Sequence, residues 1–173
     1  LPPEVSTPLK QPIAASLLSR LNTTAGLRLV KERPSDTVIS TTAAAAASPT
    51  ALTLREQGVR VEGVPPWRPR PGLDLSQVLA SLYGMGCNYV LCEGGGQVGL
   101  SLLEAGLVGE FHLHLAPKVL GDGDATPLFS GREPLSMQEA LDLRITEVDM
   151  CGEDCHLILR PRPAQQVVFT EPI

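Results

Sequence analysis

The stretch Val90-Leu-Cys-Glu-Gly-Gly-Gly-Gln-Val-Gly99 combines residue types that could hold a phosphorylated ligand. Its three successive glycines let the backbone approach a ligand closely, because no Cβ intervenes. A helix predicted to begin just after them would direct free N–H groups and its positive dipole end at the same spot, which favours a phosphate. Glu93 would repel that phosphate, so we expect its carboxylate to accept hydrogen bonds from hydroxyls or amines elsewhere on the ligand. The alternative is a purely structural turn, since Gly-Gly-Gly-x-x-Gly is not the dinucleotide fingerprint Gly-x-Gly-x-x-Gly.

Two other pairs of side chains could in principle bind a metal ion. His112 and His114 lie on one face of a predicted strand, but no third ligand is near them in the sequence, and we expect a partly exposed or interface surface instead. Asp122 and Asp124 lie in a glycine-rich loop that lacks the full oxygen set of a calcium site, so we expect solvated turn residues. The sequence therefore predicts no metal site.

The cysteines and arginines give weaker indications. Cys151 and Cys155 flank a predicted turn, and the expectation is a reduced pair, with redox or metal chemistry as the alternative. Cys87 and Cys92 are expected to act as small hydrophobes in a buried strand. Four arginines could meet a 2′-phosphate, although exposed arginines are common: Arg68, Arg70, Arg160 and Arg162.

The elements that would position these groups alternate along the chain. Residues 1–37 are rich in proline and expected to be irregular, apart from two helical turns over 14–21. Apolar patterning and caps then predict strands at 37–42, 59–64, 89–92 and 111–115, with helices at 43–47, 50–57, 74–84 and from 97 to about 105. Residues 143–149 and 155–160 are expected to form a hairpin. The fold class is therefore α/β, with a doubly wound, mostly parallel sheet and an antiparallel C-terminal hairpin.

Composition narrows the function further. A chain of 173 residues with 43% hydrophobic and 19% charged residues has room for one globular core. Its net charge of −5 argues against binding nucleic acid, and no run approaches the about 18 apolar residues of a membrane span. Four unevenly spaced cysteines argue against a secreted disulfide scaffold, so we expect a cytoplasmic protein with a small-molecule ligand.

Two longer runs carry a family resemblance. The sequence from Val90 to Val108 and then Glu110-Phe-His-Leu-His-Leu-Ala-Pro-Lys-Val-Leu-Gly121 closely resembles the reductase domain of bacterial riboflavin-biosynthesis deaminase-reductases. The run Gly152-Glu-Asp-Cys-His-Leu157 is similar to that family's final hairpin. The resemblance spans about residues 38–161, and departs from the family at Gly109, where an aspartate is usual, and over 12–36, which we cannot align. It divides the chain into an N-terminal segment 1–37, a partial reductase domain 38–162 and a tail 163–173.

The resemblance implies a dihydrofolate-reductase-like fold that binds NADPH. It implies reduction of the ribosyl group of 5-amino-6-(5-phosphoribosylamino)uracil to a ribityl chain, with hydride delivered to a ring-opened, imine-like form. Carried over by position, Glu93 matches a substrate-contacting glutamate. The residues that match the coenzyme-phosphate turn are Gly94, Gly95, Gly96, Gln97, Val98, Gly99, Leu100 and Ser101. The resemblance also implies a homodimer and a deaminase domain upstream in the full-length protein.

The resemblance assigns no catalytic residue. In the family, strands carrying further substrate contacts and a proposed proton-transfer acid precede an element that Leu1-Pro-Pro3 resembles. We therefore expect this chain to be an incomplete reductase domain that does not turn over alone. Two alternatives stay open: a non-catalytic nucleotide-binding or assembly module of the same fold, and a reductase acting on a pterin or another heterocycle.

Overall fold

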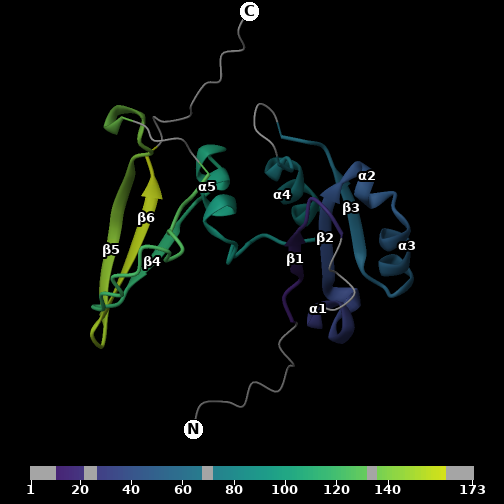
Figure 1. Cartoon of the computed structure of the whole chain (residues 1–173), viewed down its shortest axis with the longest axis horizontal. Coiled ribbons are helices and arrows are strands. Elements are labelled where there is room, and N and C mark those ends of the chain that lie inside the picture. Colours follow the sequence, from purple (N-terminus) through teal and green to yellow (C-terminus); the bar gives the residue numbers. More distant parts are fainter. Residues whose placement is uncertain (1–10, 22–26, 68–71, 132–135, 163–173) are drawn as a thin grey trace, which may run out of the picture. The chain divides into compact units, whose positions relative to one another are not determined.

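The computed structural model describes residues 11–21, 27–67, 72–131 and 136–162. They belong to two compact units that divide between Tyr89 and Val90 (Figure 1). Among these residues, no helix has the length and apolar character needed to cross a membrane. The predicted tail 163–173 and two of the candidate arginines, Arg68 and Arg70, lie outside the described residues.

The first unit is built on a parallel sheet of order β1-β2-β3 (Figure 1). Its strands are β1 (Ala14–Leu17), β2 (Thr37–Thr42) and β3 (Arg60–Val64). The central strand β2 is buried almost throughout, and Ile39 is fully inaccessible to solvent. β-Branched residues on both faces of β2 suit a strand that is covered from two sides.

Helices connect and cover these strands: α1 (Arg28–Glu32), the short 3-10 helix η2 (Pro34–Asp36), α2 (Ala43–Ala46), α3 (Pro49–Glu56) and α4 (Leu75–Gly84). Side-chain caps stand at the starts of α3 and α4. The Ser48 side chain accepts a hydrogen bond from the Ala51 amide, and Asp74 accepts from the amides of Ser76 and Gln77. The predictions for α2, α3 and α4 are therefore confirmed.

Two apolar clusters lie on opposite faces of this sheet. One joins Ile39 and Val61 to residues of α2 and α3, and the other joins Val64 to Val78 and Leu82 of α4. Successive strand residues point to opposite faces, so Val61 and Val64 belong to different clusters.

Residues 14–21 do not form the predicted helical turns. Ala14–Leu17 is strand β1, which pairs in parallel with β2 from Ala14↔Thr37 to Leu17↔Ser40. The alanines favour a helix locally, but hydrogen bonding to the exposed edge of β2 and the burial of Leu17 and Leu18 against the two clusters outweigh that preference.

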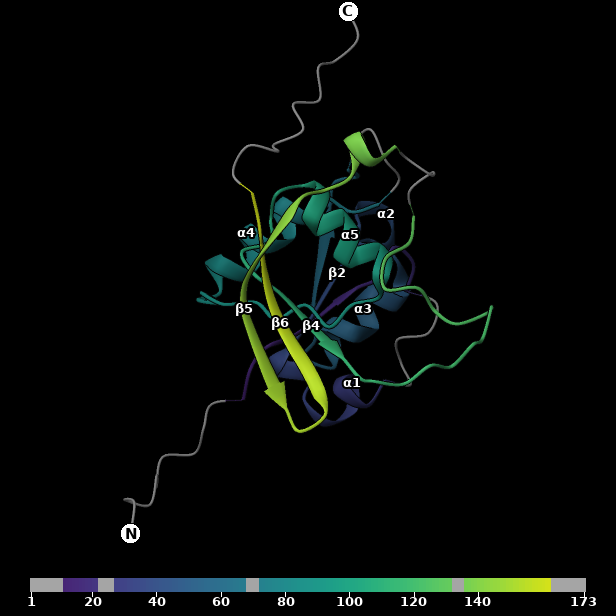
Figure 2. The same cartoon turned by 90° about the vertical axis from the view of Figure 1, so that its left-hand side faces the viewer.

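The second unit contains α5 (Gly96–Glu104) and an antiparallel sheet of order β4-β6-β5 (Figure 2). The strands are β4 (Phe111–Leu115), β5 (Leu143–Cys151) and β6 (Asp154–Pro161), and the short 3-10 helix η3 (Met137–Glu139) precedes β5. The predicted C-terminal hairpin is therefore confirmed as β5 and β6. A bulge between Ile145 and Glu147 shifts the register of that hairpin.

The two faces of this sheet differ in chemistry. One carries Phe111, Leu113, Leu157, Leu159 and their register partners on β5, and the other carries the three histidines together with charged residues. This alternation has the period of two that half-buried strands require.

The prediction for residues 89–92 is wrong. They pair with no strand among the described residues, and Tyr89 and Leu91 are 97% and 80% exposed. An apolar run becomes a buried strand only when neighbouring strands supply its hydrogen bonds, and residues 89–92 belong to neither described sheet. The assignment of 111–115 to the parallel sheet is wrong for a related reason, because β4 pairs with β6 in the antiparallel sheet.

Candidate functional site

The corner that leads into α5 has the properties of an anion site. Gly95 is the N-cap residue, with φ −66° and ψ 169°, and no side chain caps the helix. The Gly95 carbonyl accepts hydrogen bonds from the amides of Val98 and Gly99, at 3.0 and 3.2 Å. Within the described residues, the amides of Gly96 and Gln97 have no acceptor. Free N–H groups at the positive end of a helix stabilise a phosphate or carboxylate.

The three glycines of this corner are there for different reasons. A Cβ on Gly96 would lie 2.7 Å from the carbonyl oxygen of Leu128 and 3.0 Å from Cα of Phe129, so packing alone requires a glycine there. A Cβ on Gly94 would be in tight contact with Val98, at 3.3 Å. A Cβ on Gly95 would meet nothing within 4 Å, and its φ suits any residue. The structural-turn alternative thus accounts for Gly96 through packing, whereas at Gly95 it offers only the N-cap preference for glycine over alanine.

Glu93 lies beside this corner with its side chain exposed. It makes no hydrogen bond or ion pair with any other described residue, so its carboxylate is free to accept hydrogen bonds from a ligand. Later residues of the predicted range are less available. Leu100 is buried, and the Ser101 hydroxyl donates to the carbonyl of Gln97 at 2.9 Å.

A segment for which the sequence predicted no element supports this corner. The Phe129 ring approaches Gly99 of α5, where a Cβ would stand 3.4 Å from Cε1. The same ring packs against Phe111 of β4, with centroids 5.3 Å apart. The backbone at Leu128 and Phe129 therefore holds the first turn of α5 against β4. The apolar pair Leu128-Phe129 within a polar loop was the available sequence signal.

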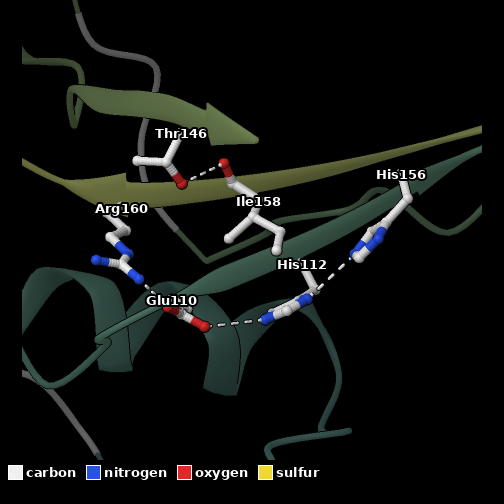
Figure 3. A network of polar contacts seen from close by, with 6 residues as sticks. All are labelled: Glu110, His112, Thr146, His156, Ile158 and Arg160. Atoms are coloured by element: carbon white, nitrogen blue, oxygen red, sulfur yellow. Dashed lines mark hydrogen bonds and ion pairs between the residues drawn. The ribbon is translucent and has the colours of Figure 1, made fainter. Parts of the chain in front are cut away.

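The polar face of the antiparallel sheet carries all three histidines of the chain, two of which, His112 and His156, are drawn in Figure 3. His112 Nδ1 lies 3.1 Å from Nε2 of His156, which pairing of β4 with β6 brings from 44 residues away. The His114 and His156 rings stack with centroids 4.3 Å apart and planes 2° from parallel. Nε2 of His112 makes a longer contact, 3.4 Å, with Glu110.

Glu110 is ionised at neutral pH. Its carboxylate accepts a hydrogen bond from the Arg160 guanidinium (Figure 3), and this bond, together with that from His112, lowers the pKa of the Glu110 carboxyl. Arg160 is consequently engaged by a carboxylate, which weakens the expectation that it meets a 2′-phosphate.

The remaining candidates are placed as follows. All four cysteines are free thiols. Cys155 is paired with Met150, while Cys151 is paired with Asp154, so the two hairpin cysteines lie on opposite faces of the sheet and are not poised to form a disulfide. Cys92 is exposed, which contradicts its predicted place in a buried strand. Asp122 accepts a hydrogen bond from the amide of Asp124, as turn aspartates do.

Comparison with known protein families gives one match that covers most of the chain. Residues 2–157 match the family described as the RibD C-terminal domain. This range includes residues 2–37, which lie outside the stretch on which the sequence resemblance was recognised.

Curated relatives match over about half of the chain. The 2,5-diamino-6-ribosylamino-4(3H)-pyrimidinone 5′-phosphate reductase of Methanothermobacter thermautotrophicus is 35% identical over 82 residues, which are 47% of this chain and 38% of that protein. The riboflavin biosynthesis protein RibD of Actinobacillus pleuropneumoniae is 32% identical over 82 residues, which are 22% of its length. The matched stretch thus covers well under half of either relative.

Solved structures agree on the fold. RibD of Acinetobacter baumannii superposes with a TM-score of 0.70 at 23% identity, over 87% of this chain and 38% of that one. A pyrimidine reductase-like protein of Corynebacterium diphtheriae gives a TM-score of 0.67 at 20% identity, over 86% of this chain and 60% of that one. Likeness at this identity establishes the fold alone, which is the dihydrofolate-reductase-like α/β class expected from the sequence.

Proposed function

The chain belongs to the RibD C-terminal domain family, and from this membership we propose that it is a nicotinamide-dependent reductase domain of riboflavin biosynthesis. Its proposed substrate class is a ribosylaminopyrimidine 5′-phosphate, whose ribosyl group is reduced to a ribityl chain. The names of relatives support this class, since one is a reductase of the diaminopyrimidinone phosphate and others are riboflavin biosynthesis proteins. Within the class we propose 5-amino-6-(5-phosphoribosylamino)uracil.

The observation that carries the proposal is the open corner at Gly95. Nothing described fills the space in front of this residue, while the neighbouring amides of Gly96 and Gln97 have no acceptor among the described residues. A coenzyme diphosphate matches both features: its negative charge suits the helix terminus, and its close approach to the backbone explains why a side chain is absent.

The residues present therefore fit a nicotinamide coenzyme, and we propose NADPH. When bound, it would supply the hydride that reduces the sugar carbon. The residues Gly94 to Gln97 would hold its phosphates, with Val98 and Gly99 continuing the same turn. Leu100 and Ser101 would act only by maintaining the helix, because one is buried and the other is bonded within it.

Glu93 would contact the substrate. Its exposed carboxylate stands next to the phosphate corner without a partner among the described side chains, and so it would accept hydrogen bonds from the ribose hydroxyls or the pyrimidine amines. Such bonds orient the sugar relative to the hydride donor, and orientation contributes a large factor to rate. We assign no proton donor.

We also propose the wider setting of this domain. Residues 38–162 would form part of a reductase domain that pairs as a homodimer in the cytoplasm, with a deaminase domain upstream in the full-length protein. The relatives named RibD support this setting, because each is much longer than the stretch that matches this chain.

A titration of the chain with NADPH, followed by coenzyme fluorescence, tests the site. Gly95→Val is expected to abolish binding, because its side chain would occupy the phosphate position. Gly109→Val is the matched control, since that glycine is also exposed with open space around it but lies outside the corner. Glu93→Ala should spare NADPH binding and weaken binding of the pyrimidine substrate. Unchanged NADPH affinity in Gly95→Val, with wild-type circular dichroism, would refute the assignment.

A further inference from the structure

We propose that His112 and His156 form a chelating site for one divalent transition-metal ion, such as Zn²⁺ or Ni²⁺, on the polar face of the β4-β6-β5 sheet. This site is independent of the reductase function. Its basis is the convergence of two ring nitrogens from strands that are distant in sequence (Figure 3).

The nitrogen separation suits a shared ion. Imidazole nitrogens bind Zn²⁺ at about 2.0–2.1 Å, so two of them lie about 3.3–3.4 Å apart in tetrahedral geometry and about 2.9 Å apart at a right angle. His112 Nδ1 and His156 Nε2 are 3.1 Å apart, between these values. An ion would take the place of the proton that the two nitrogens share, once both rings turn so that their lone pairs point at it.

Metal binding would also leave the total number of protons on the two imidazoles unchanged. When Nε2 of His112 donates to Glu110, its Nδ1 carries a lone pair and accepts the N–H of His156. Metal binding replaces that N–H contact by two metal–nitrogen bonds, and the displaced proton passes through water to the other ring nitrogen of His156. Neutral imidazoles thus need to lose no net proton.

The surroundings support ligation. Metal-bound histidines commonly donate their second N–H to a carboxylate, and Glu110 occupies that position on His112 while Arg160 holds Glu110 in place. His114 stacks face to face on His156, with the ring planes almost parallel, and so packs on the ligand ring without directing a nitrogen at the pair.

Charge on this face favours a cation. The strand register places Glu147, Asp149 and Asp154 on the same face as His156, so with Glu110 there are four carboxylates against the guanidinium groups of Arg144 and Arg160. Within the described residues, no set of three or more donor side chains converges on one point. The site would therefore use two protein ligands, with water completing the coordination.

Calorimetric titration of the full chain with Ni²⁺ at neutral pH tests the proposal. One ion per chain is expected, with affinity at least tenfold lower in His112→Gln and in His156→Gln. His114→Gln is the matched control and should stay within about threefold of wild type. Glu110→Gln should lower the affinity by about 10- to 100-fold, as loss of an outer carboxylate does in other metal sites.

Two results would overturn the assignment. One is an unchanged Ni²⁺ affinity in either ligand variant, and the other is an equal loss in His114→Gln, which would mean that the pair is not the site. If a variant fails to fold, nitrogen NMR of the wild-type imidazoles during Zn²⁺ addition decides instead. Nδ1 of His112 and Nε2 of His156 should shift, and both nitrogens of His114 should move much less. The absence of that selective shift would reject the site.

Discussion

Substituting alanine for each of the two central glycines should separate a packing requirement from a ligand requirement. In Gly96→Ala the new Cβ would stand 2.7 Å from the Leu128 carbonyl oxygen and 3.0 Å from Cα of Phe129, both of them backbone atoms that cannot rotate away. Overpacking of this kind costs about 1–3 kcal/mol. The gain from lower chain entropy on replacing glycine, about 0.4–1 kcal/mol, offsets only part of that cost.

Gly95→Ala should behave differently. Its Cβ would enter open space at an allowed φ, so the entropy gain is opposed only by the weaker N-cap preference of alanine. We expect a change within about 1 kcal/mol of wild type. The two substitutions have the same chemistry and adjacent positions, which makes Gly95→Ala the control for Gly96→Ala.

Hydrogen–deuterium exchange of the α5 amides is the appropriate assay. It reports on α5 itself, whereas the one tryptophan of the chain, Trp67, belongs to the other unit. A net cost of 1–2 kcal/mol corresponds to about 5- to 30-fold faster exchange through local opening in Gly96→Ala. Equal protection of α5 in the two variants would show that the Leu128–Phe129 backbone does not press on Gly96, and the reasoning about this corner would fail.

Three further predictions concern stability and are measured by chemical or acid denaturation. Thr41→Val should be neutral or stabilise by up to about 1 kcal/mol, since its buried hydroxyl has no partner among the described residues. Thr37→Val on the same strand should instead cost about 1 kcal/mol, because the Thr37 hydroxyl donates to the Arg33 carbonyl at 2.7 Å, and the reverse order would contradict both assignments. Arg55→Met should cost about 2 kcal/mol, because it frees two backbone carbonyls that the guanidinium now binds at 2.7 and 2.8 Å, and Arg55→Lys should rescue it only in part. The bonds to Arg160 and His112 lower the pKa of Glu110 in the folded state, so its contribution to stability is present above its unfolded pKa and is lost as the pH falls through its folded pKa. Glu110→Gln should therefore flatten the dependence of unfolding free energy on pH on the acid side of about pH 4.5. An unaltered slope in that range would count against the ion pair.

Elements with local signals were predictable from the sequence. Ser48-Pro49 and Asp74 mark helix starts through caps that depend only on neighbouring residues, and both helices begin where expected. The alternation in 111–115 likewise identified β4, although not its partner. These features are encoded within a few residues of where they appear.

Elements that depend on distant partners were not predictable. Ala14–Leu17 is a strand because β2 offers it an edge, and the apolar residues 89–92 lack strand structure because no described strand pairs with them. The sequence predicted a ligand-binding corner at Gly94–Gly96, but it could not distinguish the packing requirement at Gly96 from the open space at Gly95. That distinction depends on the backbone of residue 128, which approaches only after folding.

The two candidate sites can be tested separately because β4 directs neighbouring residues to opposite faces. Phe111 packs on Phe129, which supports the corner at Gly95, while His112 points to the other face toward His156. A substitution at one site could alter ligand binding at the other only if strand β4 itself shifted, because no described side chain connects the Gly95 corner with the His112–His156 pair. His112→Gln should thus leave NADPH affinity unchanged and Gly95→Val should leave Ni²⁺ affinity unchanged, as measured in the same titrations. A loss of both the NADPH and the Ni²⁺ affinity in either variant would instead indicate that β4 moves when a ligand binds. That result would contradict the independence of the two sites argued from the strand geometry.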